Sequence, residues 1–405
     1  MPSIRIKNIG AIADAGVIDL TPVMLIVGRQ SSGKSTFLKI LCFCSWIEKQ
    51  IVTKGSEAHK YNSRYHKFFK ELKSFYRFND VFFCDESGIF YEGKFVTIEL
   101  GSPKANVKIK RRTRNKQDVQ NSKICFIPSE RNLASVIPNI DRAYRSSNLD
   151  VIFSYLLEYQ EARTSYNSKE PLTMPFDKGI SYFFDEQKGE DQIYLEEQKR
   201  AMPVSFASSG IQSAMPLSML VDYALKLVGS VPKSSVNDIT SMVAKIVLND
   251  GEPLTADSVK VLKDEYKYKS VQLYLEEPEE NLFPRSQYDL ICFILKKLQE
   301  ASPVEECEPS RIVMTTHSPY ILTTLNFLMK ATEANDKQEG GLSSDDVPIL
   351  PSEWFSAFRM TEAGGMEDIV DHEDNFIKGD YLDSLSDFLS DESAKLDDII
   401  YGTAD

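Results

Sequence analysis

The stretch VMLIVGRQSSGKSTFLKILC, residues 23–42, decides the fold of this chain. Its first five residues are all apolar and predict a buried strand that stops at Gly28. From Lys34 to Lys49 the apolar residues recur near helical spacing and predict a helix. A strand, a glycine-containing loop and a helix are therefore expected in this order.

Residues 28–35 of this stretch, GRQSSGKS, satisfy the P-loop pattern G-x-x-x-x-G-K-[ST]. In such a loop the glycines let the backbone amides face phosphate groups, while Lys34 reaches the β- and γ-oxygens and Ser35 holds Mg²⁺. A plain glycine turn is the alternative, but the flanking strand and helix disfavour it. The expected phosphate-binding residues are Gly28, Ser31, Ser32, Gly33, Lys34, Ser35 and Thr36.

A second acidic motif, LYLEEP at residues 273–278, completes a nucleotide site. Its apolar lead-in predicts a buried strand whose C-terminal end carries two carboxylates, where open α/β sheets bind ligands. We expect Glu276 to hold Mg²⁺ together with Ser35, and Glu277 to activate the attacking water. A solvated acidic turn would explain Glu279 and Glu280, but not the apolar residues before the pair.

With these motifs the chain resembles the ABC-type ATPases, and the resemblance implies ATP as the nucleotide. The segment SSGIQ at residues 208–212 is similar to the signature LSGGQ of that family at Ser209, Gly210 and Gln212, and departs from it at Ser208 and Ile211. In the family this segment caps the γ-phosphate held by a second protomer, so a homodimer or higher homo-oligomer is implied. As a lone motif, a simple helix N-cap would be favoured.

Two further positions extend the resemblance. His317 follows the predicted strand RIVMTT and is similar to the family's switch histidine, which hydrogen-bonds the γ-phosphate. Ser129 or Glu130 stands where the family has its Q-loop glutamine. That departure puts in doubt the link between the neighbouring lobe and Mg²⁺.

Two longer motifs resemble those of one branch of the ABC-type ATPases. EEPEENLFP, residues 276–284, is similar to the EEPEAHLHP form of the overcoming-lysogenisation-defect (OLD) nuclease group, and FIPSERN, residues 126–132, resembles a motif of related stand-alone ATPases. These relatives include the ATPase subunits of the PARIS and Septu anti-phage systems. An OLD nuclease would carry a further metal-binding nuclease domain after residue 331. The remaining stretch is short for one, and Asp371, Glu373 and Asp374 fit a solvated acidic segment, so we expect no nuclease here.

The 405 residues, 42% of them hydrophobic, can bury a large core, and no apolar run approaches the roughly 20 residues of a membrane span. We therefore expect a cytoplasmic protein without membrane contacts. Six cysteines lack the paired spacings of a zinc site or disulfide scaffold and are expected to be reduced thiols.

The formal net charge of −13 opposes indiscriminate binding to nucleic acid. One basic run, residues 104–116, has no acidic residue and makes local DNA contact an open alternative. The candidate DNA contacts are Lys110, Arg111, Arg112 and Arg114.

The order of elements predicts an α/β fold, an ABC-type P-loop NTPase with a mixed, largely parallel sheet, a β-hairpin subdomain and a helical insertion lobe. Residues 1–130 would form the first part of the ATPase core, with a helical insertion near 50–80 and basic β-hairpins near 82–116. Residues 131–204 would form the helical lobe, 205–331 the second part of the core, and 332–405 an acidic α/β extension.

The leading hypothesis is an ATP-hydrolysing dimeric switch or sensor that controls a separately encoded effector protein, such as a nuclease, in prokaryotic anti-phage defence. Two rivals stay open. One is a DNA-repair or chromosome-associated ATPase that binds DNA directly, and the other is an assembly scaffold that binds ATP as structural glue. A transporter ATPase fits less well because of the long insertions.

Overall fold

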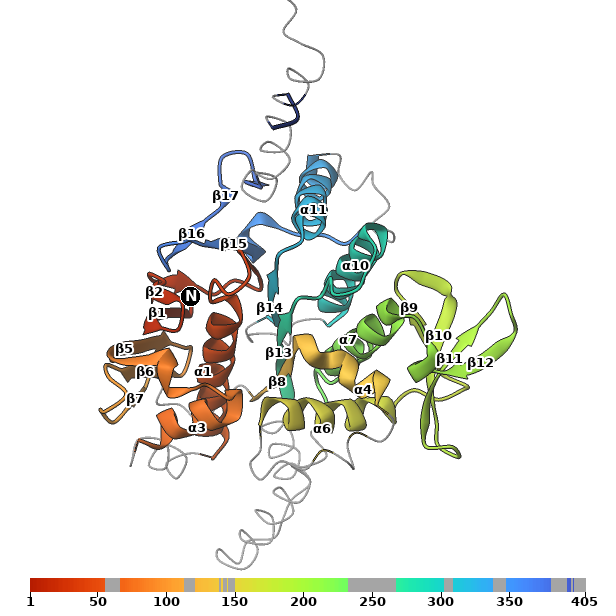
Figure 1. Ribbon diagram of the computed structural model, residues 1–405, viewed down its shortest axis with the longest axis horizontal. Coiled ribbons are helices and arrows are strands. Elements are labelled where there is room, and N and C mark those ends of the chain that lie inside the picture. The colour runs from red at the N-terminus through yellow and green to blue at the C-terminus, as the bar shows by residue number, and fades with distance from the viewer. Residues whose placement is uncertain are drawn as a thin grey trace, which may run out of the picture.

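The molecule is organised around a six-stranded sheet (Figure 1). The computed structural model describes residues 1–54, 66–112, 121–137, 140, 144, 150–231, 267–301, 309–337, 347–379, 392–394 and 396. Neighbouring strands of this sheet run parallel except for the last pair. The α/β fold with a mixed, largely parallel sheet is thus confirmed. In spatial order the strands are β8 (Asn121–Ile127), β13 (Tyr268–Glu276), β14 (Arg311–Thr316), β4 (Val23–Val27), β15 (Phe355–Met360) and β16 (Met366–Asp368).

The centre of this sheet is covered on both faces. Every residue of β4 and β14 is buried, which explains why β4 is an apolar run without alternation and why β14 is apolar at its centre. Helix α1 (Lys34–Lys54) packs against β8, β13 and β14, and α7 (Ser209–Lys226) packs against β8 and β13. Figure 1 shows α1 on one side of the sheet and α7, α10 (Pro284–Glu300) and α11 (Pro319–Lys337) on the other.

A separate antiparallel sheet lies on the outer side of α1, in the spatial order β2-β1-β5-β6-β7, with β3 paired to β1. It contains the predicted β-hairpins, and the predicted helical segment before them includes α3 (Lys67–Tyr76). Its strands are β1 (Ser3–Ile9), β2 (Ile12–Asp14), β3 (Ile18–Asp19), β5 (Phe83–Glu92), β6 (Val96–Leu100) and β7 (Lys108–Arg111).

The prediction of a helical lobe over residues 131–204 is wrong in its second half. Helices α4 (Leu133–Val136) and α6 (Val151–Arg163) are present, but a four-stranded antiparallel sheet follows them. Within β10 only Tyr182 is buried, so most positions are polar or half-exposed and the alternation typical of a strand is too weak to recognise in the sequence. The strands are β9 (Leu172–Met174), β10 (Asp177–Asp185), β11 (Glu190–Leu195) and β12 (Arg200–Pro203).

Part of the region predicted as an acidic α/β extension, residues 332–405, joins the core sheet. Strand β15 pairs in parallel with β4, so it is an inner strand of the core sheet. Its place in the sheet depends on pairing between segments that are more than 300 residues apart in the chain. Short elements complete the described chain: η1 (Asp80–Phe82), η3 (Ser129–Asn132), η4 (Val204–Phe206), η5 (Ser352–Trp354), β17 (Val370–Asp371) and β18 (Phe376–Ile377).

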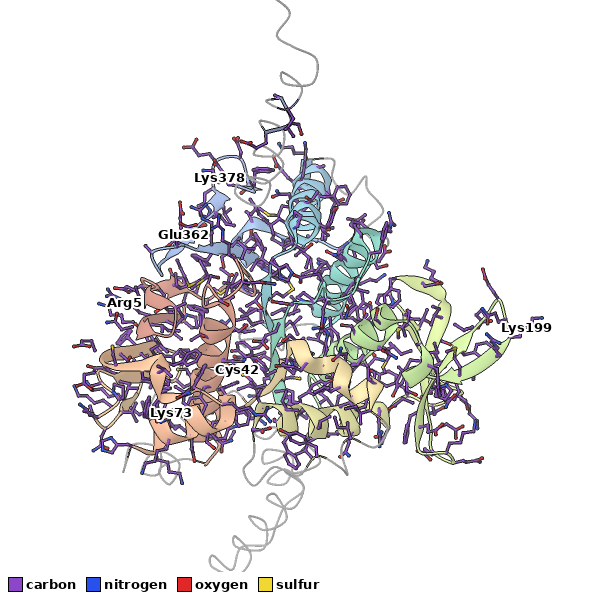
Figure 2. The ribbon with its side chains drawn as sticks, viewed as in Figure 1. Arg5, Cys42, Lys73, Lys199, Glu362 and Lys378 are labelled. Carbon is purple, nitrogen blue, oxygen red and sulfur yellow. The ribbon has the colours of Figure 1, made fainter. Side chains whose placement is uncertain are left out.

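The five described cysteines are free thiols, and Cys307 lies outside the described residues. Cys42 is enclosed on α1 (Figure 2), and burial raises the pKa of its thiol to about 12. Within the described ranges, no helix has the length and apolar character needed to cross a membrane.

Candidate functional site

The P-loop joins the end of β4 to the start of α1 and depends on two glycines. Gly28 has φ 155° and Gly33 has φ 102°, conformations that residues with a Cβ rarely adopt. A Cβ on Gly28 would lie 2.8 Å from Ser32 Oγ, and one on Gly33 would lie 2.9 Å from Ile12 Cγ1. Ser31 also has a positive φ, of 61°. The predicted glycine positions are therefore required by the backbone path.

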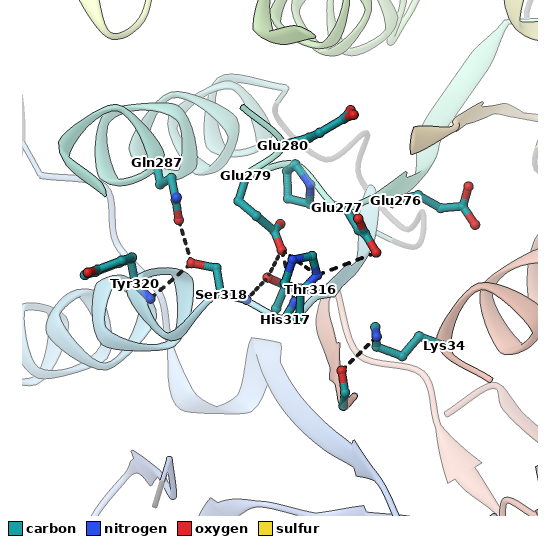
Figure 3. A network of polar contacts seen from close by, with 12 residues as sticks. Lys34, Glu276, Glu277, Glu279, Glu280, Gln287, Thr316, His317, Ser318 and Tyr320 are labelled. Carbon is teal, nitrogen blue, oxygen red and sulfur yellow. Dashed lines mark hydrogen bonds and ion pairs between the residues drawn. The ribbon is translucent and has the colours of Figure 1, made fainter. Parts of the chain in front are cut away.

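Lys34 is held inside this loop (Figure 3). Its Nζ donates hydrogen bonds to the carbonyl oxygens of Gly28 at 2.7 Å and Arg29 at 2.9 Å. Burial lowers the pKa of the ammonium group, and the nearby carboxylates of Glu277 and Glu279 partly offset that effect. The lysine is thus placed as a cation at the mouth of the loop.

A cavity of about 470 Å³ opens over the loop. Residues 30–36 line one part of it, and Glu277 faces it from the core sheet. Another part is formed by Gly10 with Ala11, in the turn between β1 and β2, and by Val81 with Phe82 of η1. Val81 is 85% exposed and Phe82 36% exposed, so this part offers an apolar surface next to the phosphate-binding backbone.

Glu276, the last residue of β13, has the environment of a metal ligand. Its side chain is 2% exposed, and Oε2 accepts the Ser129 N–H at 3.3 Å. Oε1 lies 3.4 Å from Lys39 Nζ but makes no hydrogen bond within the described residues. Burial raises the pKa of this carboxyl group, while Lys39 and the Ser35 hydroxyl favour its charged form.

This donor set fits Mg²⁺. A buried carboxylate oxygen without a hydrogen bond, beside the hydroxyl of Ser35, supplies the oxygen donors that a hard cation prefers, and Lys39 Nζ is the one cation near that oxygen among the described residues. Ser35 and Glu276 would hold the ion. The ion would supply positive charge to phosphate oxygens in the cavity.

Glu277 adopts an unusual backbone conformation directly after this strand. Its φ is 45°, which is uncommon for a residue other than glycine, and its N–H donates to the Thr315 carbonyl at 3.0 Å. The side chain is 31% exposed, and its Oε1 lies 3.6 Å from His317 Nδ1. The structure thus brings the predicted base, which lines the cavity, within 3.6 Å of the predicted switch histidine.

Glu279 is a site residue that the sequence does not reveal. It is not part of a solvated turn, because its side chain is only 6% exposed. Its Oε1 accepts hydrogen bonds from the Thr316 hydroxyl at 2.6 Å and from the His317 N–H at 3.0 Å. It therefore orients the end of β14, including the histidine (Figure 3).

Arg131 is a second residue that the sequence does not reveal, although it lies within the FIPSERN motif. The side chain is fully buried, and its guanidinium donates to the carbonyl oxygens of Glu276 and Glu277, both at 2.9 Å. Ser129 and Glu130, the Q-loop substitutes, precede it in η3. Ser129 contacts Glu276 through its N–H, whereas Glu130 is exposed and its Oε2 accepts the Ser129 hydroxyl at 3.2 Å.

The signature-like segment lies elsewhere on the surface. Ser208 and Ser209 are exposed at the start of α7, and the Gln212 amide donates to the Ser205 carbonyl at 2.9 Å. Gly210 packs so closely that a Cβ would lie 3.0 Å from the Asn281 carbonyl. None of residues 208–212 lines the P-loop cavity of the same chain.

Part of the basic run pairs with acidic residues where it is described. Arg112 pairs with Glu92 at 2.9 Å, and the Arg111 guanidinium donates to the Ile51 carbonyl at 2.5 Å. Lys108 and Lys104 pair with acidic residues of the neighbouring strands. Lys110 is exposed, and Arg114 lies outside the described residues.

The loop, the acidic end of β13 and the parallel sheet define an α/β P-loop nucleotide-binding protein. A family model described as AAA domain matches residues 3–214, and one described as AAA ATPase domain matches residues 130–322. The chain belongs to the AAA-domain family.

Solved structures with a similar arrangement have little sequence in common with this chain. An SMC head domain from Thermotoga maritima is 10% identical, covering 91% of this chain and 98% of its own, with a TM-score of 0.39. A nucleotide-free ATP-binding cassette from an ABC transporter is also 10% identical, covering 92% and 93%, with a TM-score of 0.33. No curated protein matches the sequence.

Proposed function

We propose that this protein is a Mg²⁺-dependent ATPase that works as a homodimer with two composite nucleotide sites. One observation carries the proposal. Lys34 and Glu277 line the P-loop cavity, whereas the exposed signature-like segment at the start of α7 contributes nothing to it. The exposed amides of a helix N-terminus are suited to an anion, and in this proposal Ser209 and Gly210 bind the γ-phosphate of a second copy.

In this mechanism each side chain has one task. Lys34 and the loop amides bind the phosphates, and Ser35 with Glu276 would hold the metal ion. Glu277 accepts a proton from the attacking water, and His317 donates a hydrogen bond to the γ-phosphate. Closure of the dimer excludes water from the site, and hydrolysis with phosphate release reopens it.

The test compares three variants with the wild-type chain. Glu277→Gln should keep ATP binding, lose hydrolysis by about 100-fold or more, and accumulate an ATP-bound dimer. Lys34→Ala should lose ATP binding, and Ser209→Arg should bind ATP as a monomer without hydrolysing it. Turnover is measured by phosphate release, and mass by light scattering with and without ATP and Mg²⁺.

Ser168→Arg is the matched control, because Ser168 is equally exposed in the turn between α6 and β9. It should behave like the wild type. Unchanged turnover in Glu277→Gln would remove Glu277 from its role, and a Ser209→Arg variant that still dimerises with ATP would refute the composite site.

We also propose that the ATPase cycle controls a separately encoded effector in anti-phage defence. The support is the likeness of EEPEENLFP and FIPSERN to the OLD-like group. A nuclease encoded next to this gene that co-purifies with the chain, and whose activity changes with ATP, would support the proposal. A neighbouring membrane permease would contradict it. Direct DNA binding has less support, because acidic neighbours pair with much of the described basic run.

A further inference from the structure

The guanidinium group of Arg131 lies at the junction of two functional elements. One is the loop after β13, where it donates to the carbonyl oxygens of Glu276, Glu277 and, at 3.4 Å, Pro278. The other is the signature helix α7, where its Nε donates to the Ser213 carbonyl at 3.0 Å. Ser213 comes four residues after Ser209, which is about one helical turn.

Other contacts make this junction tight. The Ser213 hydroxyl donates to Glu280 Oε2 at 3.2 Å, and that carboxylate lies 3.7 Å from the Arg131 guanidinium. The Tyr155 hydroxyl donates to the Arg131 carbonyl at 2.6 Å, which ties η3 to α6. The first turn of α7 and the loop that carries Glu277 are therefore held together through one side chain.

The chemistry of arginine suits this position. Its planar guanidinium presents five N–H donors in fixed directions, so it can bond carbonyl oxygens of two segments at once. Burying a cation is costly, and the structure offsets that cost with several carbonyl dipoles and one carboxylate. Lysine keeps the charge, but its three donors rotate about a single nitrogen, so it cannot hold both segments in the same geometry.

We propose that Arg131 is a positioning residue that couples the two nucleotide sites of the dimer. This inference rests on the proposed function, in which α7 of one protomer meets the partner's nucleotide while Glu277 acts on its own. When α7 is drawn toward the partner's γ-phosphate, Arg131 moves the carbonyl of Glu277 with it. Each site then reaches its hydrolytic geometry only when the other is occupied, and hydrolysis is cooperative in ATP.

The test is Arg131→Lys, with Arg311→Lys as its matched control. Arg311 is also buried, and its guanidinium donates to the carbonyl oxygens of Thr21 at 3.1 Å and Leu20 at 3.3 Å. It lies at the first residue of β14, at the opposite end of that strand from Thr316. Arg311→Lys therefore measures how much stability is lost when a buried arginine away from the site is replaced.

Arg131→Lys should bind ATP as the wild type does, but kcat should fall by about 10- to 100-fold and the Hill coefficient should fall to about one. Arg311→Lys should keep the wild-type kcat and Hill coefficient, even if its melting temperature falls as far as that of Arg131→Lys. Measurements are ATP affinity by calorimetry, kcat and its ATP dependence by phosphate release, and melting temperature. A wild-type kcat and Hill coefficient in folded Arg131→Lys would overturn the inference.

A second variant carries the test if Arg131→Lys does not fold. Glu280→Gln removes the charge beside Arg131 from a side chain that is 30% exposed. Like Arg131→Lys, Glu280→Gln should lower kcat and the Hill coefficient, and unchanged values would overturn the inference. If the wild-type chain binds ATP but neither dimerises nor hydrolyses it, the proposed function fails and the coupling fails with it. Cooperative wild-type turnover with unchanged variants refutes the coupling alone.

Discussion

The Nδ1 atom of His317 lies 3.6 Å from the Oε1 atom of Glu277, although the two residues follow different strands. Strands β13 and β14 are parallel neighbours in which Glu276 is paired with Thr315, so their carboxyl ends place the next residues side by side. Glu279 lies on the same side and also has its Oε1 3.6 Å from Nδ1. The predicted base, which lines the cavity, and the predicted switch histidine thus lie close together at the carboxyl ends of β13 and β14.

We expect His317→Ala to lower kcat by about 100-fold while ATP affinity changes little, because the histidine would contact the γ-phosphate most strongly during hydrolysis. Turnover and calorimetric ATP binding measure the two effects separately. His372→Ala is the control, since that exposed histidine pairs with Asp368 away from the cavity. Equal losses in both variants would argue against a specific role for His317.

Gly210→Ala should weaken ATP-dependent dimerisation. The added Cβ would lie 3.0 Å from the Asn281 carbonyl, so the start of α7 must shift from the loop that supports it. ATP binding to the monomer should persist, and turnover should fall in proportion to dimer formation. Gly101→Ala is a suitable comparison, because no atom beyond its chain neighbours lies within 4 Å of a Cβ there. Normal dimerisation of Gly210→Ala by light scattering would contradict this view of the helix start.

Val81 and Phe82 should contribute to binding of the nucleobase. They form an exposed apolar surface of the P-loop cavity, and a base gains about 1–3 kcal/mol from stacking on an aromatic ring. Phe82→Ala and Val81→Ser should therefore weaken ATP binding by about 10-fold and leave binding of inorganic triphosphate unchanged. Phe376→Ala, another exposed phenylalanine, should alter neither. Equal loss for both ligands would indicate that the variants disturb the loop itself.

Asp150 should give the chain an acid-sensitive stability. Burial pushes the pKa of Asp150 upward, but hydrogen bonds from the Phe153 N–H, Arg77 and Tyr144 outweigh it, and the pKa lies below its ordinary value. A carboxylate with a depressed pKa stabilises the fold above its unfolded pKa of about 3.9, and this contribution disappears as pH falls through the folded value.

Asp150→Asn should therefore cost about 1 kcal/mol at pH 7, where the side chain caps α6 and binds Arg77, and almost nothing in strong acid. Urea unfolding of the wild-type and Asp150→Asn chains, from pH 7 down to strong acid, measures the difference in their free energies of unfolding. Asp177→Asn, at an exposed aspartate of β10, serves as the control. A difference that stays constant with pH would contradict the assigned role of the charge.

Much of the fold could be predicted where local chemistry restricts the residue type. The P-loop needs glycine at two left-handed or crowded positions. Strand β4 is an apolar run because all of its residues are buried. The β10–β11 hairpin was not predictable in the same way, since most of its side chains are exposed or half-buried and show no clear periodicity. The acidic pair after β13 was recognisable, but the burial of Glu279 was not.

The sequence by itself determined the P-loop, the carboxylate predicted to bind the metal and the order of the motifs, because each follows from residue types at fixed short spacing. Only the tertiary structure decided that β15 enters the core sheet, that Glu279 orients His317, and that Arg131 joins α7 to the loop of Glu277. The Arg131–Ser213 bond spans 82 positions and the Thr316–Glu279 bond 37. Such contacts depend on how strands pair and helices pack across the chain, which no local pattern encodes.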